Sequence, residues 1–278
     1  MALTVNTNVT ALRAANTLNT TQGALSQTLA RVSSGLRVTS AADDAAGSAV
    51  ATNLSTKARS GQQAMRNAND GISIIQTAEA ATKEVVNILD RMRELAVQSS
   101  SETLHDDERE YIDTEFKQLS AEVERIAQAT EFNDIELSNG ENTQLSVQVG
   151  IGGGSSSQID ISLGNLEAEA LGVDTGSSGV DLSSATTAIA AIAQIDSALN
   201  DVNGMRADFG ASQNRLESSV NNMSSYVESL MSAKSRIEDA DYAHETAEMT
   251  RLQVMQQAGV AALGQAKSIN TSVISLLG

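Results

Sequence analysis

The sequence contains no cysteine, no proline and no tryptophan, and only 2% of its 278 residues are aromatic. Without cysteine the chain forms no disulfide, and it offers no thiolate for catalysis or for a zinc site. Without proline no helix has to end or bend because of a fixed φ. Because aromatic residues are so scarce, Ala, Val, Leu, Ile and Met have to supply the core. Small aliphatic side chains favour long helices packed side by side over a deep spherical core.

Acidic residues are missing from both ends of the chain. Residues 1–42 carry three arginines, and residues 249–278 carry Arg251 and Lys267, with no Asp or Glu in either stretch. Residues 43–248 therefore hold all 35 acidic residues against 13 basic ones, a net charge of −22, compared with −17 for the whole chain. This balance predicts no binding to nucleic acid, because the basic surface that such binding needs is missing. It also predicts a solvated middle and ends that other chains can cover.

Long hydrophobic runs are absent as well. No segment approaches the roughly 20 apolar residues that span a membrane as a helix, so we expect no membrane insertion. The start of the chain lacks the basic region and the apolar centre of a secretory signal peptide. If the protein leaves the cell, it needs another export route.

Apolar residues recur at steps of three and four along both ends of the chain, which is the heptad pattern of packed helices. The pattern predicts one helix over residues 1–39 and another running nearly to the C-terminus. We expect these two terminal arms to pair with each other and to drive self-association. The predicted polymerisation residues are Val5, Val9, Leu12, Leu18, Leu25, Leu29, Val32, Leu36, Leu252, Met255, Ala262, Ala266, Ile269, Val273 and Leu276.

The middle of the chain combines long helical periods with one short β pattern. The helical period runs from Val50 to Ala96 and again from Thr103 to about Thr130. Over residues 145–163 the period changes to two on either side of a Gly/Ser-rich turn, which predicts a β-hairpin. The helical period then returns from Ile192 to Ile237.

These patterns predict a mainly α fold: a long antiparallel helical bundle or coiled coil with a small β-hairpin insert and paired terminal arms. Ser40 and Asp43 resemble a capping pair at the start of the second helix. The expected divisions are the N-terminal arm 1–42, long helices plus hairpin 43–185, a long return helix 186–235, and the C-terminal arm 236–278.

Two clusters invite a catalytic interpretation, and both have a simpler one. His105 precedes the acidic run 106–108, but acids are favoured in the first turn of any helix. Residues 244–248 (HETAE) are similar to a zinc-protease motif without its second histidine. The glycines at 150–154 lack the Gly-Lys-Ser/Thr of a phosphate loop. We therefore expect no enzyme activity, no cofactor and no metal site.

Several segments carry a resemblance to a known family. They are residues 31–47 (RVSSGLRVTSAADDAAG), 70–80 (DGISIIQTAEA), 91–98 (RMRELAVQ), 132–133 (FN), 210–217 (GASQNRLE), 235–242 (SRIEDADY) and 258–266 (AGVAALGQA). In this order and spacing the chain resembles bacterial flagellin from end to end. The resemblance implies an all-helical terminal domain and a second, mostly helical domain with a hairpin, without variable outer domains.

The resemblance also implies a function and a set of partners. It implies a structural subunit that is exported unfolded and polymerises with itself into the helical filament of the extracellular flagellum, for swimming motility. The implied partners are a flagellar export chaperone on the C-terminal arm, and the filament cap and hook-junction proteins.

An immune receptor is a further implied partner. Arg91, Leu95 and Glu115 match the positions at which similar flagellins are bound by Toll-like receptor 5. An arginine that donates hydrogen bonds beside a leucine that fills a groove is a reasonable binding hot spot. The same residues can instead face neighbouring subunits of the filament, and both roles are compatible if the receptor binds only monomers.

Other functions remain open from the residues alone. A hook–filament junction protein shares the terminal arms, although the matches at 31–47, 70–98 and 210–242 favour flagellin. A secreted coiled-coil adhesin or a monomeric immune ligand is a second alternative. An enzyme is the weakest option, because the sequence contains only two histidines and no recognisable catalytic site.

Overall fold

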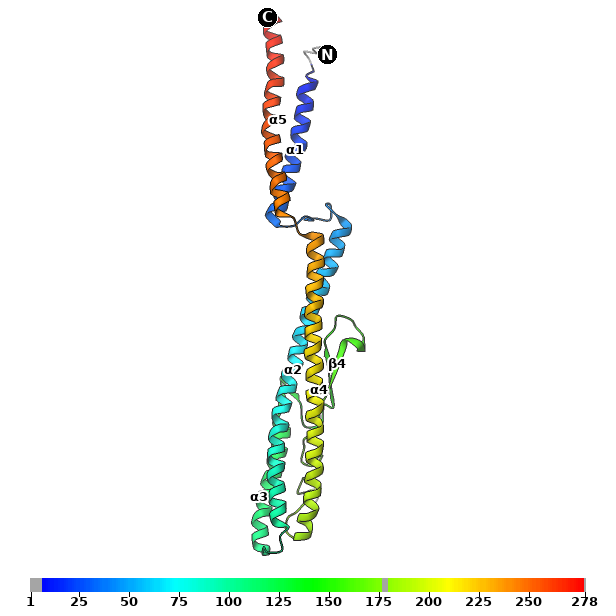
Figure 1. Cartoon of the computed structure of the whole chain (residues 1–278), viewed down its shortest axis with the longest axis vertical. Helices are drawn as coiled ribbons and strands as arrows, with labels where there is room; N and C mark the ends of the chain where they lie inside the picture. The colour runs from blue at the N-terminus through cyan, green and yellow to red at the C-terminus, as the bar shows by residue number, and fades with distance from the viewer. Residues whose placement is uncertain (1–6, 177–179, 278) are drawn as a thin grey trace. The chain divides into compact units, whose positions relative to one another are not determined.

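The computed structural model describes the backbone of residues 7–176 and 180–277, and the side chains of these ranges up to residue 268. Its long helices are α1 (Val9–Ser34), α2 (Ala45–Ser99), α3 (Asp106–Ala129), α4 (Ala185–Glu238) and α5 (Tyr242–Leu277) (Figure 1). Between α3 and α4 lie β1 (Glu131–Phe132), β2 (Ile135–Glu136), β3 (Gln144–Gln148), the 3₁₀ turn η1 (Ser155–Ser157) and β4 (Gln158–Ser162). The predicted fold class, antiparallel helices with a small β insert, is confirmed.

The chain forms two compact units. Unit 1 contains Met1–Ala58 and Glu228–Gly278, and unit 2 contains Arg59–Val227. Unit 1 therefore holds α1, α5, the start of α2 and the end of α4, while unit 2 holds the rest. Of the described helices, none is both long enough and apolar enough to cross a membrane.

Helix α1 is shorter than the sequence pattern indicates. The Oδ1 atom of Asn8 accepts a hydrogen bond from the Ala11 amide at 2.9 Å and caps the N-terminus. The C-terminus is set by Gly35, whose φ of 71° is left-handed and stops the helical ladder. The prediction of a helix through residue 39 is therefore wrong, and Leu36 lies beyond the helix.

The start of α2 also differs from the prediction. The Asp43 carboxylate accepts hydrogen bonds from the amides of Thr39 and Ser40, so it closes the loop before the helix. The neighbouring Asp44 caps α2, because its Oδ1 accepts from the Gly47 amide at 2.8 Å. The capping carboxylate thus belongs to Asp44 and not to Asp43. From Ala45 the helix runs without interruption to Ser99.

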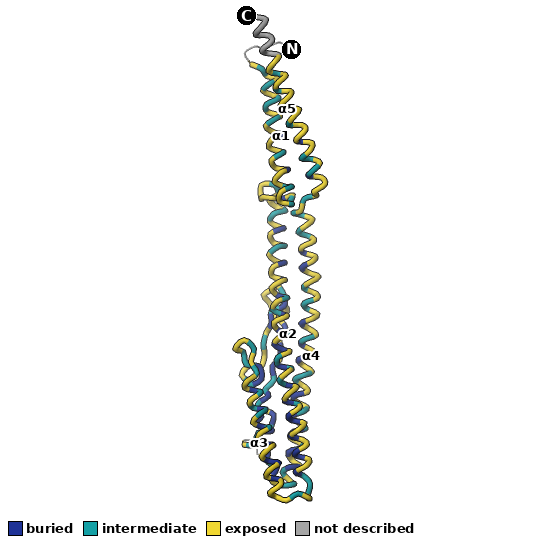
Figure 2. The backbone as a smooth tube through the Cα atoms, turned by 90° about the vertical axis from the view of Figure 1, so that its left-hand side faces the viewer, coloured by how far each residue is buried: buried dark blue, intermediate teal, exposed yellow. Residues whose placement is uncertain are grey.

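Unit 2 is built around a core shared by α2, α3 and α4. Helices α2 and α4 run antiparallel, with Arg93 Nε donating to Asp196 Oδ1 at 2.7 Å. Figure 2 shows that the buried residues gather in this unit. The largest fully buried side chains are Phe116, Ile75, Leu89, Met92, Leu95, Leu137, Ile161, Leu166, Leu182, Ile195, Leu216 and Val85.

Residues 163–176 and 180–184, which form no helix and no named strand, complete this core. We call these residues the strap. The strap buries aliphatic side chains against α2, α3 and α4, including Leu166, Val173 and Leu182. Buried polar groups fix its backbone: Ser99 Oγ donates to the Leu182 carbonyl at 2.7 Å, and Asp113 Oδ1 accepts from the Leu182 amide at 3.1 Å. These bonds satisfy backbone groups that would otherwise be buried without partners.

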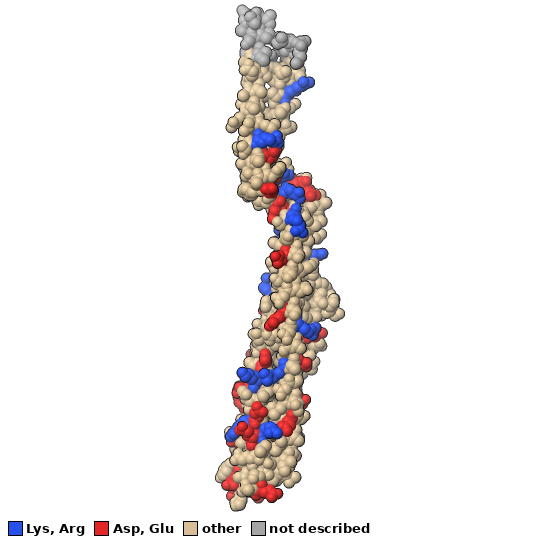
Figure 3. Space-filling view, in the orientation of Figure 1, with Lys and Arg blue, Asp and Glu red and all other residues tan. Residues whose placement is uncertain are grey.

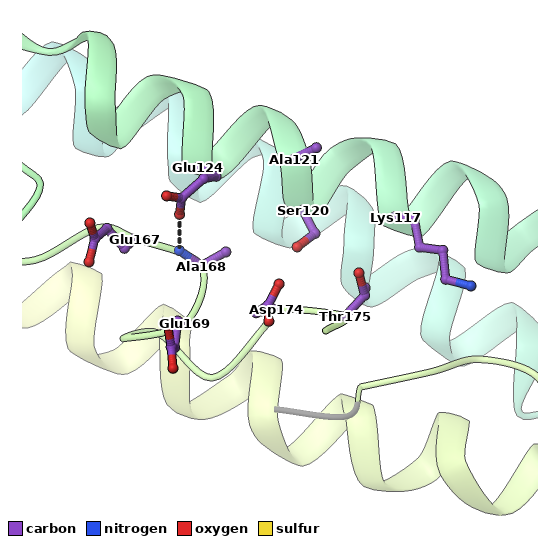
Figure 4. A pocket seen from close by; sticks show the side chains of 9 residues that line it. All are labelled: Lys117, Ser120, Ala121, Glu124, Glu167, Ala168, Glu169, Asp174 and Thr175. Carbon is purple, nitrogen blue, oxygen red and sulfur yellow. Dashed lines mark hydrogen bonds between the residues drawn. The ribbon is translucent and has the colours of Figure 1, made fainter. Parts of the chain in front are cut away.

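The strap and α3 enclose a polar pocket of about 420 Å³. Figure 4 shows its lining, in which Glu124 points at the strap and accepts a hydrogen bond from the Ala168 amide at 3.1 Å. Ser120 Oγ donates to the Val173 carbonyl at 3.1 Å from the same face of α3. The polar side chains of this pocket therefore hold the strap in place.

The predicted hairpin is confirmed. Strands β3 and β4 pair antiparallel, with Val147 opposite Ile159 and Leu145 opposite Ile161. Its apolar face packs on Ile75 and Leu216 of the long helices, as part of one core cluster. A second β-hairpin pairs β1 with β2 through a two-residue turn, Asn133 and Asp134, which both have positive φ. Asn and Asp tolerate this conformation better than other non-glycine residues, which suits a two-residue turn.

Candidate assembly surface

Helices α1 and α5 lie side by side and antiparallel in unit 1 (Figures 1 and 2). Their less exposed residues alternate at steps of three and four and form the inner seam. On α1 the inner seam contains Ala11, Ala14, Leu18, Thr21, Leu25, Thr28 and Val32, and on α5 it contains Glu245, Met249, Leu252, Gln256, Gly259, Leu263 and Ala266. Gly259 admits a close approach, since a Cβ there would lie 3.3 Å from Leu18 Cδ1.

The inner seam also contains polar residues. Thr21 and Thr28 are the buried residues of α1, and their hydroxyls donate to the carbonyls of Thr17 and Ala24 on the same helix. Gln256 Nε2 donates to Gln22 Oε1 across the pair. Near the other end, Asn8 Nδ2 donates to the Ala266 carbonyl at 2.9 Å. Polar contacts therefore join the arms together with the apolar residues of the seam.

Six other large aliphatic side chains of the arms lie outside the inner seam. We call them the exposed apolar set, and they are 41–60% exposed. The set is Val9, Leu12, Leu29, Val254, Met255 and Val260. On the face drawn in Figure 3 the described part of the α1–α5 pair carries few charged side chains, so this surface is mostly uncharged.

The structure thus divides the predicted polymerisation residues into two groups. The inner seam includes Leu18, Leu25, Val32, Leu252 and Ala266, while the flanks of the pair include Val9, Leu12, Leu29, Met255 and Ala262. Leu36 lies outside α1, for the reason given above. Val5 lies outside the described residues, as do the side chains of Ile269, Val273 and Leu276.

Residues 35–37 and 238–242 contact each other, and we call these two segments the elbow. The elbow joins the end of α1 to the end of α4 and the start of α5. Leu36 and Asp239 form an antiparallel bridge. The Arg37 amide donates to the Glu238 carbonyl at 2.6 Å, and the Ala240 amide donates to the Gly35 carbonyl at 2.9 Å. Two backbone segments far apart in sequence are therefore held together by main-chain bonds.

Side chains reinforce the elbow by capping helix ends. The Tyr242 hydroxyl donates to the Val32 carbonyl in the last turn of α1, at 2.7 Å. Arg37 Nη2 donates to the Ile237 carbonyl in the last turn of α4, also at 2.7 Å. Helix C-termini leave carbonyls without helical partners, and these two donors satisfy one at each end.

An ion pair joins the two arms just beyond the elbow. Arg31 Nη1 lies 3.5 Å from Glu245 Oε1, and Glu245 is only 7% exposed. In the sequence, Glu245 stands out only as part of the HETAE segment, and no pattern assigns a role of their own to Arg31, Arg37 or Tyr242. The available signal was that Arg31 is one of only two charged residues within α1.

The loop before α2 is anchored by Asp43. Its Oδ2 accepts from the amide and hydroxyl of Thr39 and from the amide of Ser40, and its Oδ1 accepts from Gln27 on α1. These hydrogen bonds favour the charged carboxylate and lower the pKa of Asp43 from 3.8 to about 2, with the Thr39 hydroxyl as the largest cause.

The residues predicted to bind a receptor lie in unit 2. Arg91 Nε and Nη2 both donate to Glu115 Oε1, at 3.0 and 2.9 Å, and Nη1 donates to Glu94. The hydrogen bonds that Arg91 donates to Glu115 and, to a smaller extent, to Glu94 raise the pKa of Arg91 above its ordinary value. Arg91 and Glu115 are exposed, but Leu95 is only 2% exposed and belongs to the core around Phe116. Leu95 therefore does not offer the groove-filling side chain that the sequence suggests.

Neither histidine lies in a metal-binding arrangement. The His105 amide donates to Glu108 Oε2 at 3.0 Å, so this cluster caps α3 as an ordinary helix start. His244 lies on α5, where the neighbouring Glu248 pairs with Arg251. Within the described residues, no group of three or more His, Cys, Asp or Glu side chains is placed to hold a metal ion.

Comparison with known proteins decides the family. The model of the bacterial flagellin N-terminal helical region matches residues 5–143, and that of the C-terminal helical region matches residues 192–277. The chain belongs to the bacterial flagellin family. A flagellin from Halalkalibacterium halodurans is 39% identical over 273 residues, which cover 98% of this chain and 99% of that protein. The flagellar filament 33 kDa core protein of Treponema phagedenis is 38% identical over 283 residues, with 98% and 99% covered.

A solved structure also shares the fold. A flagellar hook-associated protein from Vibrio parahaemolyticus matches with a TM-score of 0.59 and 18% identity, over 71% of this chain and 100% of that chain. At this identity the likeness supports the fold alone. Flagellins are structural proteins that polymerise into extracellular flagellar filaments, and full-length similarity to them makes this chain a filament subunit.

Proposed function

We propose that the α1–α5 pair is the surface through which this flagellin polymerises, and that the exposed apolar set contacts neighbouring copies in the filament. The observation that carries the proposal is the exposure of six large aliphatic side chains on a pair of helices that bears little charge. Burying the exposed half of these side chains contributes on the order of 5–9 kcal/mol per subunit. In an isolated monomer this contribution is missing, so we expect the arms to become ordered mainly on assembly.

Truncation and point variants test this proposal. Deleting residues 1–36 or 252–278 should leave unit 2 folded, because its core lies within Arg59–Val227, and should abolish seeded filament growth observed by electron microscopy. Replacing Leu12 and Leu29 by Ser should weaken growth, whereas Thr20→Ala, at another exposed α1 position, should not. Filaments that form from either truncated chain would contradict the proposal.

The same arms are also the surfaces that export and assembly partners would bind. We propose that the chain leaves the cell through the flagellar export channel, and that an export chaperone covers the C-terminal arm until then. A chaperone that shields α5 would hide Val254, Met255 and Val260, which are otherwise open to solvent. We further propose that the filament cap and the hook-junction proteins contact the arms at the two ends of the polymer.

We also propose that the monomer is recognised by Toll-like receptor 5 through the exposed Arg91–Glu115 pair. The pair offers a guanidinium and a carboxylate on neighbouring helices, and paired side chains of this kind lose little conformational freedom on binding. Leu95 would then contribute only indirectly, by packing α2 against the core and so fixing the position of Arg91 on that helix.

Receptor signalling by purified monomers tests this part. Arg91→Ala and Glu115→Ala should each reduce signalling potency by about tenfold, as expected for a hot-spot residue. The matched control is Arg125→Ala, which breaks an exposed ion pair with Glu122 on α3. Unchanged potency in both test variants, with unchanged thermal unfolding, would remove the receptor from the proposed function.

A further inference from the structure

The inner seam of the α1–α5 pair is repetitive. Apart from its polar members, it consists of Ala, Leu and Val on α1 and of Leu, Met, Gly and Ala on α5. Sliding one helix along the other by one heptad would again place small or medium aliphatic residues opposite one another. The apolar contacts therefore define the register of the two arms only weakly, and they do not decide whether an α1 pairs with the α5 of its own chain or of another copy.

The Arg31–Glu245 pair breaks this repetition. Glu245 is buried at the seam and faces Arg31 across 3.5 Å. One heptad further along α5 the seam holds Leu252, so a shifted register would leave the buried carboxylate without a cation. The nearest other acid on α5 is Glu248, which pairs with Arg251. An unpaired buried charge is strongly disfavoured, and buried polar groups set the register in other helical pairs.

The elbow delivers both partners of this pair from the same chain. Arg31 lies one turn before Gly35, whose carbonyl accepts from the Ala240 amide, and Glu245 lies in the first turn of α5. The Tyr242 hydroxyl, on the same turn of α5, is already bound to the Val32 carbonyl. The local concentration of the chain's own α5 next to its α1 is therefore far higher than that of an α5 from another copy.

The structure pairs α1 with the α5 of the same chain. We propose that the Arg31–Glu245 pair, held at the elbow, is what selects this partner and this register. This inference rests on the proposed polymerisation through the arms. It adds that Arg31 and Glu245 are the specificity-determining residues of the pairing within one chain.

Charge reversal in the full chain tests the proposal. The variants are R31E, E245R and the double variant R31E/E245R, and the measurement is the critical concentration for growth from filament seeds. Each single variant should raise the critical concentration by about tenfold or more, because like charges then meet at the seam. The double variant should recover growth close to that of the wild type. The matched control, E248R/R251E, reverses an exposed pair within α5 and should have little effect.

A mixture of the two single variants separates the alternatives. If arms were exchanged between copies, the new glutamate of R31E would meet the new arginine of E245R, and an equal mixture would grow well. We expect no such recovery, and recovery would overturn the inference. Failure of the double variant to recover, or normal growth of the single variants, would also overturn it. Wild-type protein that grows no filaments would instead overturn the proposed function on which the inference rests.

Introduced thiols give a second measurement. Because the chain has no cysteine, L18C/G259C contains only the two thiols placed opposite each other at the seam. After oxidation of assembled filaments, denaturing gels should show cross-linked single chains and few dimers. The control L18C/A266C, one heptad out of register, should cross-link poorly. A ladder of dimers and larger species from L18C/G259C would show pairing between copies and contradict the proposal.

Discussion

In unit 2, helices α2 and α3 bury Ile75, Leu89 and Phe116 completely, whereas in unit 1 Leu12 and Leu29 of α1 leave more than half of their surface in solvent. Both regions are helical and both carry apolar heptads. Three helices with the strap and the hairpin can enclose a common core, but two helices share only one seam and leave their flanks open. We therefore expect unit 2 to be stable by itself and the arms to depend on further chains for burial of their flanks.

The largest expected effect contrasts a core residue with an arm residue. Phe116→Ala should lower the free energy of unfolding of the monomer by about 3–5 kcal/mol, because it opens a cavity in the unit 2 core. Leu12→Ala should change it by less than about 0.5 kcal/mol, since this side chain is exposed. Urea unfolding followed by circular dichroism measures both. An equal loss of stability in the two variants would contradict the difference in burial between unit 2 and the arms.

A smaller effect is expected at two glycines of the long helices in unit 2. A Cβ at Gly61 of α2 would lie 2.6 Å from Val227 Cγ2 on α4, so Gly61→Ala should cost about 1–3 kcal/mol through overpacking. Gly204 of α4 faces open space, and Gly204→Ala should stabilise the helix by about 0.5–1 kcal/mol. Thermal unfolding of the two variants should shift in opposite directions, and shifts in the same direction would contradict this packing.

A still smaller loss of stability is expected when a hydrogen bond to the strap is removed. Ser99→Ala removes the buried hydrogen bond to the Leu182 carbonyl and leaves that carbonyl without the donor, at a cost of about 1–2 kcal/mol. The neighbouring Ser100 donates only to the Val97 carbonyl at the surface, so Ser100→Ala is the matched control and should be nearly neutral. If the two variants unfold at the same urea concentration, the Ser99 bond does not hold the strap.

The smallest effect concerns the pH dependence of the loop before α2. The pKa of Asp43 is lowered from 3.8 to about 2, so its hydrogen bonds contribute fully above about pH 4 and are lost as the pH falls toward 2. Hydrogen exchange of the Thr39 and Ser40 amides should therefore become less protected across this range. In Asp43→Asn the protection should be lower and nearly independent of pH there. A wild-type profile that stays flat between pH 4 and 2 would show that Asp43 does not hold the loop.

Much of the fold was predictable because long periodic segments carry strong signals. The change from a period of about 3.6 to one of two located β3 and β4, and the absence of proline allowed helices as long as α2. The strap was missed as a structural element, since residues 163–184 have no period. Its position is determined by buried partners such as Ser99 and Asp113, which are distant in sequence.

For the arms, the sequence predicted the helices but only part of the seam between them. The predicted α1 stripe is divided in the structure: Leu18, Leu25 and Val32 lie on the inner seam, whereas Val9, Leu12 and Leu29 are exposed. The buried Thr21 and Thr28 were not predicted for the seam. Spacing identifies residues that can be buried, and it does not say by which chain. A hydropathy pattern misses the threonines because it counts them as polar. Their hydroxyls donate to carbonyls of their own helix, so they can be buried without a partner on α5.

Composition and residue spacing alone established a cysteine-free and proline-free helical chain with sparsely charged arms and an acidic middle, and the motifs identified the flagellin family. Three features became visible only in the folded chain: the face by which each arm meets the other, the residue at which α1 ends, and the pairing of Arg31 with Glu245 and of Tyr242 with the Val32 carbonyl. The physical reason is that helix propensity and amphipathicity act over a few turns. The partner of a buried carboxylate, a capping hydroxyl or a strap amide is chosen instead by contacts between residues far apart in the chain.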